Sequence, residues 1–173
     1  MAAGVLSTWL AGESERLVWI EFDAYARQVF AGGTDEWLSV ANTFVAGVSQ
    51  AQDVVRTEVL SIDALAPCVA ALAADAAAPA AAAQAALDLD APRRFGAAVT
   101  DALAHRFAGH IDIVLKIGSP AALLRAAGLA GEPAFDDLDD IGIGLSNLLR
   151  DYATKPLAVV LVACPGSPSA DES

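Results

Sequence analysis

Apolar residues recur at helical spacing through the first part of the chain. From Val18 to Val29 they fall four, three and four residues apart, which places them on one face of a helix. The pattern predicts a helix over 14–31, which Gly32-Gly33 would end. The other sides of this helix are apolar as well, and helices of that kind are usually covered on several sides.

A second run of apolar residues predicts a longer helix directly afterwards. Between Trp37 and Val55 the spacing alternates between four and three residues, as along the seam between two packed helices. Thr34 can cap this helix. Because only Gly-Gly-Thr separates the two predicted helices, we expect an antiparallel hairpin. The predicted fold class is therefore mainly α, a helical bundle built on this N-terminal hairpin.

The middle of the chain is rich in alanine. Residues 70–86 have high helix propensity but little apolar surface to bury, and Pro79 must break or restart any helix there. We expect a thin helix or a hinge near 70–86. The chain as a whole is interpreted as a single helical domain over 1–165. Its last residues, 166–173, are polar and small and predict a disordered tail.

Capping residues and prolines predict three further helices. One begins at Asp90, a short one begins at Pro120 and ends at Gly128, and one runs over 136–152.

Two apolar segments could be either strands or helices. In 110–118 isoleucine and leucine alternate as in a strand, but Asp112 and Lys116 have the spacing of a helical ion pair. We favour a helix there, because no comparable strand follows nearby. Residues 156–163 are β-branched and bounded by prolines, so they could form a strand. Short strands at 110–118 and 156–163 therefore remain an alternative.

Composition and charge narrow the classes of function. The 173 residues carry a formal charge of −12, with 22 Asp and Glu against 10 Lys and Arg. Such a chain is a poor match for nucleic acid. No apolar run reaches the ~20 residues of a membrane span. Cys68 and Cys164 are interpreted as reduced thiols and no signal peptide is recognised, so we expect a cytoplasmic protein.

Four aspartates lie within five residues, in the run Phe135-Asp136-Asp137-Leu138-Asp139-Asp140. On a helix Asp136 and Asp140 share a face and Asp137 lies beside them, so three carboxylates could hold Mg²⁺ bound to a diphosphate. The run resembles the Asp-Asp-x-x-Asp motif of isoprenoid diphosphate synthases and terpene cyclases. That resemblance implies a divalent metal and an isoprenoid-like ligand. The other interpretation is that these aspartates stabilise the first turn of a helix through its dipole.

Aromatic residues are concentrated near the N-terminus. Trp19 lies off the apolar stripe of the first predicted helix, which makes it a candidate for a protein interface or an apolar ligand pocket. The candidate residues for such a site are Trp19, Phe22, Tyr25, Phe30 and Trp37.

The sequence shows no phosphate-binding loop, nucleophile elbow or paired-histidine metal motif. We therefore predict a non-catalytic helical subunit that acts by binding a protein partner or its own copy, without a cofactor. The alternative hypothesis is an enzyme or binder for an apolar, isoprenoid-like ligand, with Mg²⁺ held by Asp136, Asp137 and Asp140.

Overall fold

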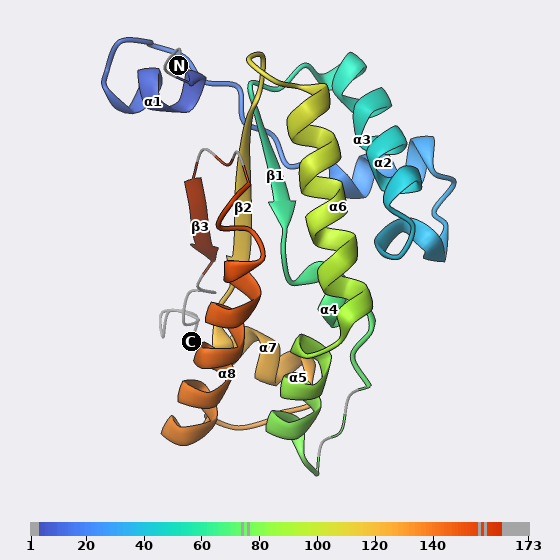
Figure 1. Ribbon diagram of the computed structural model, residues 1–173, viewed down its shortest axis with the longest axis vertical. Helices are drawn as coiled ribbons and strands as arrows, with labels where there is room; N and C mark the ends of the chain where they lie inside the picture. Colours follow the sequence, from blue (N-terminus) through green and yellow to red (C-terminus); the bar gives the residue numbers. More distant parts are fainter. Residues whose placement is uncertain (1–3, 74, 76, 156, 158, 164–173) are drawn as a thin grey trace, which may run out of the picture.

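The computed structural model of the protein describes residues 4–73, 75, 77–155, 157 and 159–163. This part of the chain is mainly helical and contains a small parallel sheet (Figure 1). Its helices are α1 (Val5–Leu10), α2 (Asp23–Phe30), the 3-10 helix η1 (Asp35–Leu38), α3 (Ala41–Val55), α4 (Ala66–Ala70), α5 (Pro79–Leu87), α6 (Asp90–Arg106), α7 (Pro120–Ala126) and α8 (Phe135–Arg150). Its strands are β1 (Val59–Asp63), β2 (Asp112–Gly118) and β3 (Val159–Ala163).

In the described residues the three strands are parallel and lie in the order β1-β2-β3. Parallel neighbours need crossover connections, and helices supply them here: α4, α5 and α6 link β1 to β2, and α7 and α8 link β2 to β3. β2 lies in the middle and is buried on both faces, as its apolar sequence from Ile113 to Ile117 requires.

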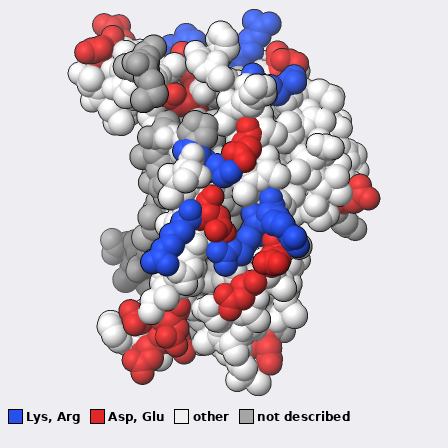
Figure 2. All heavy atoms as spheres, in the orientation of Figure 1, with Lys and Arg blue, Asp and Glu red and all other residues white. Residues whose placement is uncertain are grey.

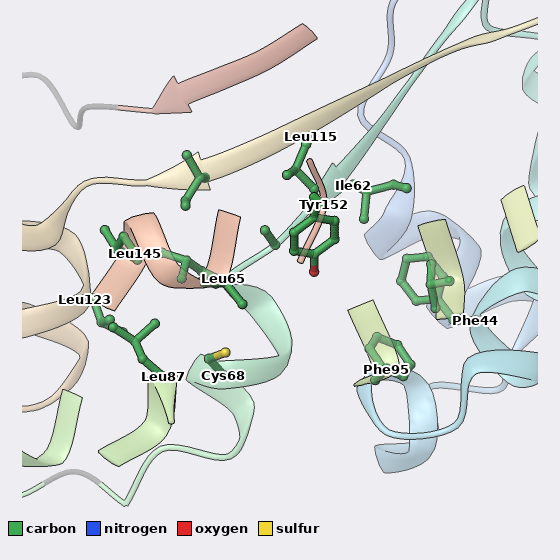
Figure 3. Close-up of a cluster of buried hydrophobic side chains, with 14 of the residues drawn as sticks. Phe44, Ile62, Leu65, Cys68, Leu87, Phe95, Leu115, Leu123, Leu145 and Tyr152 are labelled. Carbon is green, nitrogen blue, oxygen red and sulfur yellow. The ribbon is translucent and has the colours of Figure 1, made fainter. Parts of the chain in front are cut away.

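One face of the sheet packs against the helices and forms the main core. Leu60 and Ile62 of β1 lie beside Ile113 and Leu115 of β2 in the register of the sheet, and all four are buried. Helices α3 and α6 cover this face through aromatic side chains, with Phe44 and Phe95 edge to face at a ring separation of 5.8 Å (Figure 3). Leu87 of α5 belongs to the same core.

The other face of the sheet is covered by the N-terminal segment. Leu6 of α1 and Trp19 pack against the buried Val59 and Val114. The carboxylate of Asp112, at the start of β2, accepts a hydrogen bond of 2.7 Å from the backbone N–H of Leu6 and so fastens α1 to the sheet. Figure 1 shows α1 at the end of the molecule where β2 begins.

The predicted N-terminal hairpin is wrong. Residues 14–31 do not form one helix, because α2 begins only at Asp23. The preceding residues run beside β1: the carbonyl of Val18 accepts a 2.8 Å bond from Glu58 N–H, and Trp19 forms a parallel bridge with Val59. These bonds satisfy the backbone at the edge of the sheet, which a helix in this position would leave open.

The expected helix at 110–118 is also wrong, since residues 112–118 form the central strand β2. The alternative of short strands at 110–118 and 156–163 is the one that the structure confirms. The strand β1 was not predicted from the sequence. It pairs with β2 along its full length from Val59 to Asp63. Without β1, the only candidate partner for β2 was the possible strand at 156–163.

One predicted helix cap is confirmed, since Ser119 accepts a hydrogen bond from the backbone N–H of Ala122 and caps α7. The prediction that Thr34 caps the helix over 37–55 is wrong: Thr34 accepts a bond from Glu36 N–H and caps η1, and α3 begins only at Ala41. Pro79 starts α5, as expected for a proline in the first turn. The expected hinge near 70–86 includes residues outside the described part of the chain and stays a prediction, and the expected tail at 166–173 lies wholly outside it.

None of the described helices is long and apolar enough to cross a membrane.

Candidate functional site

Two of the five predicted aromatic site residues are core residues. Trp37 is buried and stacks on Phe44 with the ring centres 4.6 Å apart. Phe22 is also buried, but it lines a small cavity beside β1. Phe22 therefore stays a candidate for a ligand pocket. The packing of Trp37 in the core explains its apolar side chain without a ligand.

Trp19 is half-buried on the second face of the sheet. Its indole N–H donates a 2.8 Å hydrogen bond to the hydroxyl of Ser61 in β1. This bond satisfies the polar end of the ring and orients the segment that runs along the edge of the sheet. Trp19 lies off the helical stripe of the sequence because it does not belong to a helix.

Tyr25 and Phe30 lie together on α2. Their rings meet edge to face with the centres 5.7 Å apart. Phe30 packs against the main core, whereas Tyr25 is 40% exposed and its neighbour Val29 is 54% exposed. Figure 2 shows that the side of the molecule over α2 and α3 is largely free of charged groups. This surface is the part of the predicted aromatic site that an interface could use.

The predicted metal ligands lie at the start of α8. Asp136 and Asp140 are exposed and Asp137 is half-buried. Figure 2 shows the acidic groups gathered at this end of the molecule. In the described residues, no three His, Cys, Asp or Glu side chains are placed to hold a metal ion together. The aspartates do occupy the first turns of α8, where negative charge stabilises a helix, and metal binding there stays a prediction.

A cavity of about 60 Å³ lies beside β1. It begins where the segment after Trp19 leaves the edge of the strand. The buried walls come from β1, α3 and α6 and are Leu60, Ile62, Phe44, Val48, Phe95, Val99 and Leu103, with Phe22 from the segment before α2. Because these buried walls are hydrocarbon and aromatic, this part of the cavity favours apolar groups.

The rim of the cavity carries charged side chains. Lys116 of β2 donates to both carboxylate oxygens of Glu21, at 3.0 Å each. This hydrogen bonding raises the pKa of Lys116, and the charges of Asp63 and Asp23 act in the same direction. The residues that line the cavity thus include three carboxylates and one ammonium group.

Two buried groups lie close to the cavity wall. The hydroxyl of Tyr152 packs against Gly96, a wall residue, and has no hydrogen-bond partner among the described residues (Figure 3). Burial also raises the pKa of the Cys68 thiol to about 11. A thiol with that pKa is protonated and unreactive at neutral pH, so Cys68 is a packing residue rather than a nucleophile.

Comparison of this chain with protein-family models, with curated proteins and with solved structures finds no match.

Sequence reasoning did not find the cavity. Its walls come from four separate segments, and its rim joins Glu21 to Lys116 across 95 positions of sequence. Recognising Val59–Asp63 as a strand parallel to β2 would have placed Asp63 beside Lys116, because neighbouring parallel strands end at one edge of a sheet.

Proposed function

We propose that this protein binds a small ligand whose apolar part enters the cavity beside β1. The observation that carries the proposal is the combination of buried apolar walls with a charged rim, at the end of a parallel strand. Pockets of this composition, with a few polar groups around an apolar interior, are the usual form of small-molecule sites. Open parallel sheets commonly bind ligands at the carboxyl ends of their strands.

The size of the cavity limits the ligand. Pockets for drug-sized molecules measure about 300–1,000 Å³, whereas this cavity holds about 60 Å³. An interior of this size takes only a short alkyl group, and the rest of the ligand lies at the rim. The proposed small-molecule site is therefore this cavity, and the proposal does not depend on the aspartates of α8.

Filling the cavity is the direct test. Butan-1-ol titrated into the ¹⁵N-labelled full chain is expected to shift the amide signals of Ile62 and Val99. In Val99→Ile the added methyl group is expected to fill part of the cavity. We expect a gain of about 0.5–1 kcal/mol in stability and at least a tenfold loss of alcohol affinity. Val54→Ile adds the same group at an exposed site of α3 and should change neither quantity.

If the alcohol leaves the cavity amides unshifted, or if Val99→Ile binds it as well as the unaltered chain does, the proposed function is wrong.

A second candidate function is association with a protein partner or with another copy of the chain, through the outer side of α2. The observation in its favour is the exposed pair Tyr25 and Val29 beside a surface with few charges, in a chain whose net charge is −12. Interface cores are enriched in aromatic residues and depleted of charge in this way.

Val29→Asp is expected to abolish self-association. The measurement is the molecular mass of the full chain from analytical ultracentrifugation at roughly 5–100 μM, a range in which weak dimers form. Ile143→Asp on α8 is the matched control, because Ile143 is 55% exposed and Val29 is 54% exposed. A monomer across the whole range for the unaltered chain, or equal effects of the two variants, would exclude this surface as a self-interface.

A further inference from the structure

Among the described residues that line the cavity, negatively charged side chains outnumber positively charged ones. Glu21, Asp23 and Asp63 all lie at the rim with Lys116. Both oxygens of Glu21 are engaged by the ammonium of Lys116. One ammonium group cannot balance three carboxylates, so the rim attracts a further cation.

The two remaining carboxylates differ in what they already bind. Asp63 ends β1, and one of its oxygens accepts hydrogen bonds from the backbone N–H groups of Leu65 and Ala66, at 2.9 and 3.1 Å. Its second oxygen accepts none from the described residues. Asp23 is exposed at the first position of α2 and makes no hydrogen bond or ion pair within the described chain. Carboxylate oxygens on both residues are thus available to a donor.

The position of these carboxylates relative to the cavity specifies the shape of the ligand. The rim lies directly against the buried hydrocarbon of Leu60, Ile62 and Phe44. A ligand that satisfies both regions has a positively charged, hydrogen-bonding head and a short apolar tail. An anion would meet like charge, and a neutral molecule would gain no charge-assisted hydrogen bond from the carboxylates.

We propose that the cavity selects primary amines with a short alkyl tail, the ammonium group lying between Asp23 and Asp63 and the tail between β1, α3 and α6. This inference rests on the proposed function and names its ligand class. Charge-assisted hydrogen bonds are roughly twice as strong as neutral ones, so the rim discriminates by charge while the walls discriminate by size.

A series of matched ligands tests the selection. Butylamine, butan-1-ol and butanoate share an alkyl chain and differ in the charge of the head group. We expect butylamine to bind the ¹⁵N-labelled chain about tenfold more tightly than butan-1-ol, and butanoate not to bind. High salt should weaken the amine and leave the alcohol unchanged, because rim charges are screened.

Two substitutions locate the effect. Asp23→Asn should reduce butylamine affinity about threefold and leave butan-1-ol affinity unchanged, whereas Asp139→Asn, an equal charge change on α8, should alter neither. Glu21→Gln leaves one ammonium group against two carboxylates at the rim, so butanoate should still not bind.

The outcomes separate the two proposals. If none of the three ligands shifts the cavity amides, the proposed function fails and the inference fails with it. If butan-1-ol binds as tightly as butylamine, or if Asp23→Asn and Asp139→Asn affect butylamine equally, the cavity binds apolar groups without selecting amines and only the inference is overturned.

Discussion

Replacing Gly96 with alanine is expected to destabilise the protein by about 2 kcal/mol, which lowers the melting temperature by roughly 4–8 °C. In an ordinary helix the same change stabilises, because alanine is the better helix former by up to about 1 kcal/mol. Here a Cβ on Gly96 would overlap the hydroxyl oxygen of Tyr152. Tyr152 is buried, so its ring cannot move aside without disturbing the core.

Tyr152→Phe should have the opposite effect. The hydroxyl of Tyr152 is buried without a hydrogen-bond partner in the described chain, and such a group costs about 1–3 kcal/mol. Removing it is expected to stabilise the protein by about 1 kcal/mol. In the double variant the new Cβ at position 96 would lie 3.2 Å from the ring carbon Cζ, a close but tolerable contact.

Thermal and urea unfolding of the two single variants and the double variant provide the measurement. The double variant should recover most of the stability that Gly96→Ala loses, which gives a coupling energy well above the ~0.5 kcal/mol of independent sites. Additive effects, or a stable Gly96→Ala variant, would show that the hydroxyl of Tyr152 does not pack on α6.

Gly47→Ala is expected to cost about 1–3 kcal/mol. A Cβ at this position in α3 would lie 2.7 Å from Cζ3 of Trp37 and 3.6 Å from the carbonyl oxygen of Ala26. The indole cannot retreat, because its other side is stacked on Phe44, which itself meets Phe95. Gly47 therefore allows η1 and α2 to approach α3 closely.

Gly142→Ala on α8 is the control for this substitution. Nothing lies within 4 Å of a Cβ at Gly142, so alanine there should stabilise the chain by up to about 1 kcal/mol. Urea unfolding followed by circular dichroism compares the two variants. The packing described for Trp37 is contradicted if both variants change stability in the same direction.

The helical part of the fold could largely be predicted from local signals. Helix α7 begins at the Ser119-Pro120 pair, as predicted. Helix α8, at Phe135–Arg150, nearly matches the helix predicted over 136–152. Of the apolar seam predicted from Trp37 to Val55, Phe44, Val48 and Ala51 form the buried side of α3. These features depend on residues within a few positions of one another, where capping and helical periodicity are sufficient evidence.

The sheet could not be predicted in the same way. Val59–Asp63 is only five residues long, and its bonding partners lie more than 50 positions away in β2. Residues 14–21 have the apolar spacing of a helix, yet Thr57 and Glu58 bind their backbone and hold it beside β1. Tertiary hydrogen bonds therefore outweigh a local helical preference that amounts to only tenths of a kcal/mol per residue.

The sequence by itself determined that the chain is acidic, mainly helical and rich in aromatic residues near its start, because composition and short-range periodicity carry that information. The tertiary structure alone decided which aromatic residues are core, and that Glu21, Asp63 and Lys116 meet at one cavity. Parallel pairing of β1 with β2 causes this meeting, since it brings the ends of distant strands to a common edge. The spacing of these three residues along the sequence does not predict that they meet.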